Sequence, residues 1–475
     1  MSQHPPEQHP SDERRAARRR TAATPGRRVD RMLLAAVLVP LLTVGAVLLA
    51  DLEVAPRASE QAPAESDLGR STVVCPSASQ DGRLLVASGT GATGAVTLGT
   101  GGDTEDLPLA RRAAGVVEAG VDGVQVITGV DDLAPGLVAA RTSGPGLRAV
   151  ACAATSSDQW FTGVGAGAEH TSVLELTNPD AGPATVDVLV HGQSGPVAAD
   201  GLRGVSVPGG GTVRLRLGSE IPKREELALQ VTTDRGRVAA VVVDAFVPIG
   251  RGVPTKEYLP GQAEPAGTNV LMGLPAGSGE RTVVVANGSE DVARVRLELV
   301  TARSVFAPSD VEEVTIDPGS VKRLSIAGLL RSEAASDALG LRVVSSRPVT
   351  ATFRARTGAD LVESVPGGRV STTTLLLAPT GAKQLLLADA DAVGVVRVEA
   401  RTVDGKRLLR RKVEITPEVG LQVELPDGAQ VVEVRPEGVS LVGSVLVDTD
   451  GGAAVLPLRE LVRTDLVPAV RPGRP

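Results

Sequence analysis

Strand-like segments recur four times along this chain at a nearly constant spacing. In the last three copies, a short apolar run ends at a polar turn-former, which is Asn178, Asn287 or Asp389. These positions lie roughly 100 to 110 residues apart, and self-similarity at a fixed period is the mark of a tandem array. A chain of 475 residues is long enough for an array of this kind.

Each copy contains two extended apolar runs separated by a polar turn, and the pattern predicts a β-hairpin. The four segments are 137–154, 227–246, 341–356 and 430–447.

The remaining runs of each copy indicate strands rather than helices. Segments such as 213–217 and 421–425 alternate Val or Leu with Arg, Gln or Glu, so one face is apolar and the other polar. Aromatic residues make up only 1% of the chain, so the cores must consist of aliphatic side chains, which suit thin two-layer packing. The sequence therefore predicts an all-β protein of tandem immunoglobulin-like β-sandwich domains arranged as a rod. A single β-propeller is the alternative, but its blades need only about 40 to 50 residues each.

The pattern also predicts the boundaries of these parts. They are a disordered basic cytoplasmic tail at 1–31, a transmembrane helix at 32–50, a linker at 51–70, β-sandwiches at 71–156, 157–262, 263–366 and 367–462, and a flexible tail at 463–475.

The segment 32–50 carries no charged residue and, as a helix, would be about 28 Å long, close to the thickness of the hydrocarbon core. Eight arginines precede it within 14–31, whereas Asp51 and Glu53 follow it. The excess of positive charge before the span predicts a single-pass protein of the cell membrane, with its N-terminus in the cytoplasm and its repeats outside. The predicted partner of 32–50 is therefore the lipid bilayer. A cleaved signal peptide is the alternative.

Two cysteines occur, Cys75 and Cys152, and both follow the apolar segment. An isolated pair in a segment outside the cytosol predicts one disulfide. Two buried free thiols are the alternative. The spacing excludes a C-x-x-C zinc or redox motif.

Several short motifs resemble functional sites but lack an essential part. The glycine-rich segment 89–94 matches a dinucleotide-binding pattern, yet the residues after it do not form a helix that could carry a pyrophosphate. The segment 448–452 resembles part of a calcium loop without its glutamate, and it is expected to be a hairpin tip. His170 and His191 are the histidines of the predicted external region, and both are expected at the surface. The sequence therefore predicts no catalytic, cofactor-binding or metal-ligating residue, and no enzyme.

Two features remain as candidate contact surfaces. The adjacent aromatics Trp160 and Phe161 can form an exposed binding platform, although packing between the first and second domains is the preferred interpretation. A basic cluster follows the turn at 404–405: Lys406, Arg407, Arg410, Arg411 and Lys412. It can contact an anionic envelope polymer, but a solvated edge strand protected by charge is preferred. The acidic balance of the repeats and their few aromatics argue against nucleic acid as a partner.

The order of these features resembles a known family. The basic tail, the apolar span, Cys75, Cys152 and the following segment 158–163, together with the Val/Leu-rich strands, are similar to membrane-anchored extracellular proteins of high-GC Gram-positive bacteria whose function is unknown. The resemblance implies a location in the cell envelope, and it supplies no catalytic residues.

These observations predict a non-enzymatic scaffold of the bacterial cell envelope that binds or spaces other components. Its partner would be an envelope protein or polysaccharide. Two alternatives stay open: an exported enzyme that acts on cell-wall polymer through a pair of carboxylates, and an accessory subunit that contacts a membrane complex through the apolar span.

Overall fold

The structure is a computed structural model of the whole chain. It describes residues 31–52, 64–78, 81–100, 103–118, 122–144, 146–250, 252–262, 264–309, 311–358 and 360–467. All but the last residue of the predicted tail at 1–31, and most of the predicted linker at 51–70, lie outside these ranges. By contacts the chain divides into two units, residues 65–467 and the segments 1–64 with 468–475.

The apolar segment near the N-terminus forms a helix, α1 (Arg31–Leu52), which contains Pro40. Among the described residues, no helix is both long enough and sufficiently apolar to cross a membrane.

The regular secondary structure of residues 65–467 is almost entirely antiparallel strands, which we group into four repeats. Repeat 1 contains β2 (Arg70–Cys75), β3 (Arg83–Ser88), β4 (Gly94–Thr100), β5 (Asp103–Leu109), β6 (Gly115–Val117), β7 (Gln125–Val130), β8 (Leu137–Ser143), β9 (Arg148–Ala151) and β10 (Ala153–Ala154). Repeat 2 contains β11 (Asp158–Ala166), β12 (His170–Thr177), β13 (Ala184–Gly192), β14 (Gly195–Val197), β15 (Val205–Val207), β16 (Thr212–Arg216), β17 (Arg224–Arg235), β18 (Ala239–Phe246) and β19 (Thr255–Pro260).

Repeat 3 contains β20 (Ala266–Met272), β21 (Glu280–Ala286), β22 (Ala293–Thr301), β23 (Val305–Phe306), β24 (Val314–Ile316), β25 (Val321–Ser325), β26 (Ala338–Thr357) and β27 (Asp360–Ser364). Repeat 4 contains β28 (Thr374–Leu377), β29 (Ala382–Ala388), β30 (Gly394–Arg401), β31 (Arg407–Ile415), β32 (Leu421–Leu425), β33 (Val431–Glu437), β34 (Val442–Thr449) and β35 (Gly452–Pro457). Short helical turns lie at α2 (Leu217–Glu220), α3 (Ala327–Leu330), η1 (Asp131–Leu133), η2 (Asp200–Leu202) and η3 (Glu333–Ala335).

Every repeat is a two-layer β-sandwich with the same strand order. In repeat 4 the first sheet has the order β28-β33-β30-β31 and the second β32-β29-β34-β35, and repeat 1 has the matching sheets β10-β2-β7-β4-β5 and β6-β3-β8-β9. Repeats 2 and 3 follow the same scheme, but their layers are joined, by the β11–β12 pairing in repeat 2 and by the long strand β26 in repeat 3. In an immunoglobulin constant domain the first two strands share a sheet. Here they lie in different sheets, so the sandwich prediction holds while its immunoglobulin-like connectivity is not confirmed.

The predicted hairpin is present in segment 137–154, where β8 pairs with β9, but the other three predictions were wrong. In segment 227–246, β17 pairs with β11 and β13, whereas β18 pairs with β12 and β19, so the two strands lie in different layers. Segment 341–356 lies within the single strand β26, and β33 and β34 of segment 430–447 belong to opposite sheets. An apolar run reports that a strand is buried but not which strand pairs with it, so a crossing between layers has the same pattern as a hairpin.

Each sandwich encloses an aliphatic core. In repeat 4, for example, Leu385, Leu387, Val396 and Val398 are fully buried between the two sheets. On β29, the alternate residues Leu386 and Ala388 point to the opposite face of the strand from Leu385 and Leu387, and they are also buried. Strands that are apolar on both faces must be covered on both sides.

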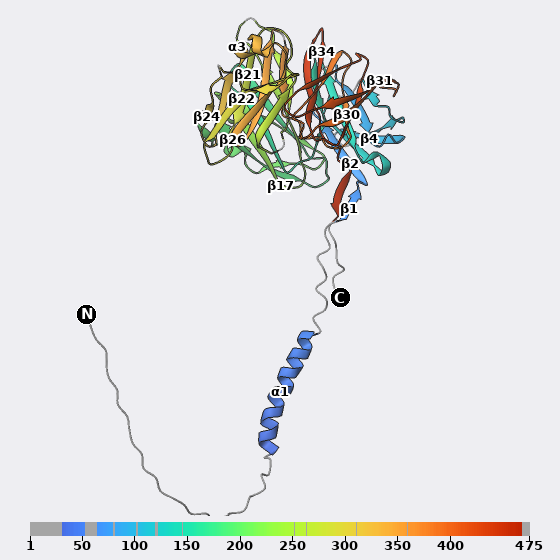
Figure 1. Cartoon of the computed structure of the whole chain (residues 1–475), viewed down its shortest axis with the longest axis vertical. Coiled ribbons are helices and arrows are strands. Elements are labelled where there is room, and N and C mark those ends of the chain that lie inside the picture. The colour runs from blue at the N-terminus through green and yellow to red at the C-terminus, as the bar shows by residue number, and fades with distance from the viewer. Residues whose placement is uncertain are drawn as a thin grey trace, which may run out of the picture. The chain divides into compact units, whose positions relative to one another are not determined.

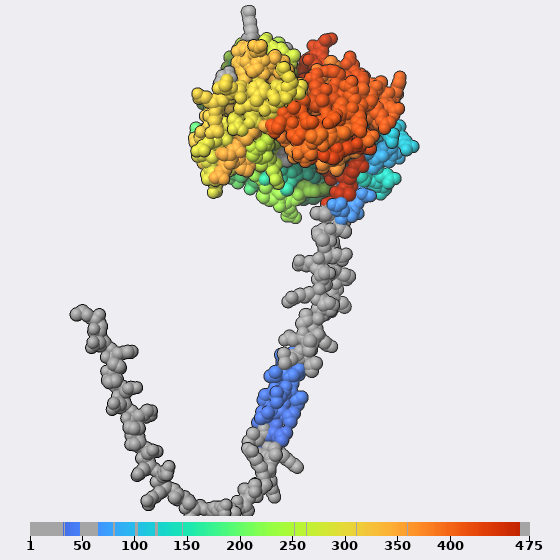
Figure 2. Space-filling model, in the orientation of Figure 1, coloured from blue at the N-terminus to red at the C-terminus, as the bar shows by residue number. Residues whose placement is uncertain are grey.

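The second covering comes from the neighbouring repeat. The first sheet of repeat 1 packs on the second sheet of repeat 2. Repeat 2 packs on repeat 3 in the same way, and so does repeat 3 on repeat 4. Leu377 and Val431, from the first sheet of repeat 4, then pack on Leu85 and Ala140, from the second sheet of repeat 1. The repeats therefore close into a ring, and the predicted rod was wrong. Figure 1 and Figure 2 show repeat 4, in orange to red, beside both repeat 3, in yellow, and repeat 1, in blue.

The strands β9, β19, β27 and β35, one from each repeat, contact one another in a cycle at the centre of this ring.

The segment after β35 ties repeat 4 to repeat 1. The Val462 carbonyl accepts a hydrogen bond of 2.8 Å from Gly136 N, and Leu461 lies against Gly89. The chain then forms β36 (Thr464–Val467), which pairs with β1 (Ala64–Asp67). The predicted linker at 51–70 and flexible tail at 463–475 therefore each contain a strand.

Candidate functional site: an arginine-lined groove

A groove of about 530 Å³ lies at the seam where repeat 4 meets repeat 1. Among the described residues that line it are seven arginines and two glutamates: Arg112, Arg397, Arg401, Arg407, Arg410, Arg435, Arg463, Glu399 and Glu433. Arg112 comes from repeat 1 and Arg463 from the segment after β35, while the other charged residues belong to repeat 4. The groove is thus strongly positive in a chain whose formal net charge is −7.

Strand periodicity explains how repeat 4 presents these charges. Along β30, Val396, Val398 and Ala400 point into the sandwich core, so the intervening Arg397, Glu399 and Arg401 must point to the opposite face. That face is turned toward repeat 1. On the neighbouring strands, Arg435 lies opposite Arg397, and Glu433 lies opposite Glu399.

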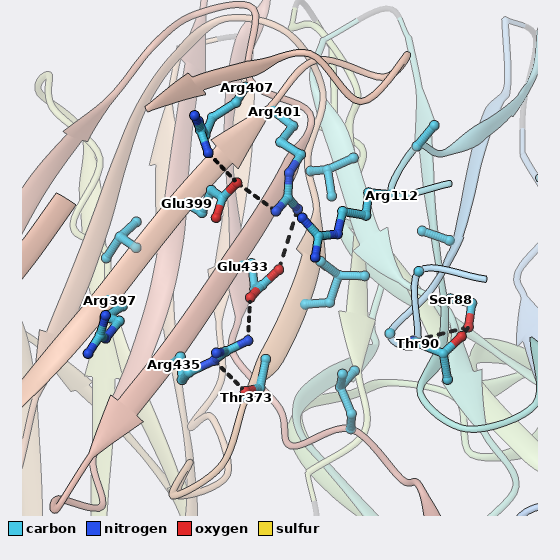
Figure 3. A pocket seen from close by; sticks show the side chains of 18 of the residues that line it. Ser88, Thr90, Arg112, Thr373, Arg397, Glu399, Arg401, Arg407, Glu433 and Arg435 are labelled. Atoms are coloured by element: carbon cyan, nitrogen blue, oxygen red, sulfur yellow. Dashed lines mark hydrogen bonds and ion pairs between the residues drawn. The ribbon is translucent and has the colours of Figure 1, made fainter. Parts of the chain in front are cut away.

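An ion-pair ladder holds the floor of the groove. The side chain of Arg401 is only 5% exposed, and its guanidinium lies 2.7 Å from Glu399 and 3.4 Å from Glu433. Glu433 also contacts Arg435 at 3.0 Å, and Glu399 lies 3.9 Å from Arg407. Figure 3 shows this ladder running from Arg407 to Arg435, where the Arg435 Nε donates to Thr373 Oγ1 at 3.0 Å. The two carboxylates therefore position arginines.

Three arginines of the groove have no acidic partner among the described residues, and one of them, Arg463, donates to the Gly89 carbonyl. Within the part of the chain that the structure describes, neither Arg112 nor Arg410 forms an ion pair, and both are exposed. Guanidinium groups present forked N–H donors that match the oxygens of phosphates and carboxylates. The arrangement is therefore suited to binding an anion.

The glycine-rich segment 89–94 forms one edge of this groove, but its backbone does not cradle a phosphate. Gly89 N donates to the Gly136 carbonyl at 2.8 Å, and Gly91 N donates to the Ser88 carbonyl at 3.1 Å. The strand β4 follows the loop, as expected, instead of a helix. The contribution of the loop is a carbonyl, since Gly89 O accepts a hydrogen bond of 3.2 Å from Arg463.

The predicted disulfide is confirmed: Cys75 and Cys152 are bonded across 77 positions of sequence. It joins the start of repeat 1 to its end.

Trp160 and Phe161 do not form an exposed platform. Phe161 is fully buried in the core of repeat 2. Trp160 is 4% exposed, stacks on His191 with ring centroids 5.1 Å apart, and lies against Gly288 of repeat 3. The junction that Trp160 fills is therefore between repeats 2 and 3, and the expectation that it fills the junction between the first two was wrong.

The expectation of surface histidines was also wrong, because His170 and His191 are both buried. His170 Nε2 lies 2.9 Å from Asp244 Oδ2, and Ser172 Oγ donates to the other oxygen of the same carboxylate. In a catalytic triad the histidine lies between the serine and the carboxylate. Here the carboxylate lies between the other two, so the geometry is not that of a triad.

A buried ionic cluster joins repeats 2 and 3, and no sequence pattern predicted it. Arg354 on β26 is 3% exposed, and its guanidinium lies 3.0 Å from Glu363, 3.4 Å from Glu226 and 3.7 Å from Asp244. Its Nη2 also donates to the Gly163 carbonyl. Glu226 and Asp244 belong to repeat 2, whereas Arg354 and Glu363 belong to repeat 3, so this cluster joins the two repeats.

One cation facing three carboxyls shifts their proton affinities in different directions. Burial and the negative charge of Asp244 raise the pKa of Glu363 to about 8, although Arg354 opposes the shift. The pKa of Asp244 is lowered. Burial acts to raise it, but this effect is outweighed by the attraction to His170 and Arg354 and by the hydrogen bonds from His170 and Ser172. Glu363 is therefore the carboxyl that keeps its proton at neutral pH.

Glu363→Gln is expected to reduce the pH dependence of stability. Because the pKa of Glu363 is about 8 in the folded protein and close to 4.3 when unfolded, the folded state holds an extra proton between these values and loses stability as the pH rises through them. Glutamine cannot titrate, so the free energy of unfolding should fall less from pH 5 to pH 8 in the variant, by at least about 1.4 kcal/mol. Urea titrations at the two pH values measure this, and equal slopes in both proteins would contradict it.

The remaining motif lies at a hairpin tip. Residues 450–451 connect β34 to β35, which pair in register from Ser444–Pro457 to Thr449–Gly452. Within the described ranges, no group of three or more His, Cys, Asp or Glu residues is arranged to hold a metal ion.

Comparison with known proteins gives a family without an assigned activity. The model of the Family of unknown function (DUF5719) matches residues 113–426, which run from the later part of repeat 1 into repeat 4. No curated protein matches the chain. Since the match covers well over half of the sequence, the chain belongs to the Family of unknown function (DUF5719).

Proposed function

We propose that this protein is a non-enzymatic scaffold, anchored in the membrane on the outer side of a bacterial cell envelope, that binds an anionic partner through the arginine-lined groove. The observation that carries the proposal is the groove itself. Seven arginines from three separate parts of the chain converge there around two glutamates.

The electrostatics of the groove favour binding over catalysis. Glu399 and Glu433 are each held in ion pairs with arginines, so both carboxylates are committed to the ladder. The exposed arginines carry a fixed positive charge at all physiological pH values. Such an array attracts anions and orients them, which is the role of a scaffold that holds a partner in place.

Arg112 and Arg410 provide the sharpest test of binding. Neither has an acidic partner among the described residues, so Arg112→Gln with Arg410→Gln removes two charges without leaving a buried carboxylate unpaired. We expect the double variant to bind an anionic polymer, such as extracted cell-wall polymer, at least about tenfold more weakly, equivalent to about 1.4 kcal/mol. Titration calorimetry at low ionic strength measures this affinity.

Arg411→Gln is the matched control. Arg411 neighbours Arg410 on β31, is also exposed, and does not line the groove, because adjacent strand residues point to opposite faces. The control removes one positive charge from the same strand and should leave the affinity almost unchanged. Equal losses in Arg410→Gln and Arg411→Gln would mean that overall charge rather than the groove attracts the partner.

Membrane anchoring and orientation are supported by the sequence at 14–53, where eight arginines precede the uncharged segment and acids follow it. We expect alkaline phosphatase fused after Pro475 to be active in intact cells, because that enzyme requires an oxidising compartment for its disulfides. A cytoplasmic reporter such as β-galactosidase at the same position should be inactive. The reverse result would overturn the orientation.

A further inference from the structure

We infer that the ligand of the groove is a linear polymer in which phosphodiester groups are separated by uncharged units, and that it contacts two rows of arginines at once. This inference rests on the proposed function and names the chemical class of the partner.

The pairing of the strands arranges the charges of the groove in rows. Arg397 on β30 lies opposite Arg435 on β33, and Arg401 on β30 lies opposite Arg407 on β31. Arg397 and Arg401 are four residues apart on one strand, so the two rows are separated by about 13 Å. At the floor of the groove Glu433 already contacts one arginine of each row, Arg435 and Arg401. The outer members, Arg397 and Arg407, are 48% and 56% exposed, and a ligand that contacts both of them has to span the distance between the rows.

A row that contains two carboxylates lies between the arginine rows. Glu399 on β30 is opposite Glu433 on β33 and opposite Arg410 on β31. The carboxylates disfavour negative charge directly above them, because like charges repel at short range. Arg410, at the β31 end of this row, is exposed and can still contact an anionic group. A ligand that spans the groove should therefore carry anionic groups over the arginine rows and beside Arg410, and a neutral segment over the two carboxylates.

The lining of the groove also indicates what it does not bind. Among the described residues that line it, none has an aromatic side chain on which a neutral sugar ring could stack, since they are charged, polar or aliphatic. Trp160, Phe161 and Phe353 are buried in other parts of the protein. Anchors for a protein partner are enriched in tryptophan and tyrosine as well as arginine, and of these three the described residues of this groove supply arginine alone.

The choice of arginine over lysine fits phosphodiesters. Each exposed guanidinium can donate two parallel hydrogen bonds to the two free oxygens of one phosphodiester. Glu433 pairs with the guanidinium of Arg435, and Glu437 pairs with that of Arg397. Because these arginines are already held in place, they lose less conformational entropy when a ligand binds.

The test compares four probes on the full-length protein in detergent micelles: inorganic phosphate, an oligomer of glycerol phosphate, inorganic polyphosphate and poly-glutamate. We expect the glycerol phosphate oligomer to bind at least about 100-fold more tightly than inorganic phosphate, because it engages both rows. Arg397→Gln, which removes a charge from one row, should weaken oligomer binding about tenfold. Arg411→Gln should not, and thermal melts of each variant check that the fold is intact.

Any other result contradicts either the inferred ligand class or the proposed function. Equal affinity for the oligomer and for inorganic phosphate would mean a single-anion site, which overturns the inference but leaves the proposed function. Tighter binding of polyphosphate would show that a neutral spacer is not required, and tighter binding of poly-glutamate would indicate an acidic protein. In both cases the inference fails. If no anion binds, the proposed function fails as well.

Discussion

Arg354→Met is expected to lower the free energy of unfolding by about 3–5 kcal/mol. Arg354 is the cation at the centre of the cluster between repeats 2 and 3, where it contacts Glu226, Asp244 and Glu363. Among the described residues, removing it leaves Asp244 and Glu363 buried without an arginine partner, while Glu226 keeps Arg323 of repeat 3 at 3.6 Å. A buried charge without compensation is costly. Urea denaturation at pH 7, followed by circular dichroism, measures the loss.

Arg356→Met supplies the control for this experiment. Arg356 lies two residues further along β26 and pairs with Glu280 at 3.0 Å, but its side chain is 34% exposed. Ion pairs that water reaches contribute little, so this variant should lose no more than about 1 kcal/mol. If both variants lose the same small amount, the buried cluster does not hold repeats 2 and 3 together.

The second large effect concerns the disulfide of repeat 1. The double variant Cys75→Ala with Cys152→Ala should lose about 4 kcal/mol of unfolding free energy, because the bond closes a long loop and restricts the unfolded chain. Alanine is chosen because Cys75 is fully buried in the core of repeat 1 and tolerates a small apolar replacement better than a polar one. Urea denaturation under oxidising conditions compares the variant with the wild-type protein.

The wild-type protein in excess reductant is the control for the disulfide, and it should unfold at the same urea concentration as the double variant. A loss below about 1 kcal/mol in the variant would show that the ring contacts, and not the covalent bond, hold repeat 1 together.

The position of the groove follows from the way the ring closes. Consecutive repeats are joined by the chain, but repeats 4 and 1 are not consecutive. They meet through packing, through a hydrogen bond of 2.8 Å from Ala114 N to the Val403 carbonyl, and through the segment after β35. Leu461 and Arg463 of that segment also line the groove. A ligand that contacts both walls would therefore add a link at the one junction that the chain does not connect.

Part of the fold could be predicted from residue patterns. The alternation of apolar and polar residues located most strands, and the turn-formers Asn178 and Asn287 were recognised at equivalent positions. The structure shows why these residues are asparagines: each is fully buried, and its side-chain amide donates to carbonyls of the following loop, such as Gly182 O and Asp291 O. These interactions are local, so the sequence carries a direct signal of them.

The packing of the repeats on one another also left a signal in the sequence. The second strands of repeats 1, 3 and 4 are apolar at every position in the runs 84–87, 283–286 and 385–388. A sandwich exposes one face of each sheet, so its strands should alternate. Continuous apolar runs indicate burial on both faces, which excludes isolated sandwiches in a rod.

The candidate site could be predicted only in part. The cluster around Arg407 and Arg410 was visible because its members are neighbours in sequence. Arg112 and Arg463 join it only because repeat 1 and the C-terminal segment pack against repeat 4. The buried cluster around Arg354 was hidden for the same reason, since a lone arginine in a strand has the pattern of a solvent-exposed residue.

The amino-acid sequence by itself determined the strands, their two faces, the repeat length and the disulfide, because these depend on residues close in sequence or on the pairing of two unique cysteines. The tertiary structure decided the layer to which each strand belongs, the closure of the ring and the gathering of arginines at its seam. Periodicity reports whether a side chain is buried, but the element that buries it depends on packing between segments hundreds of residues apart.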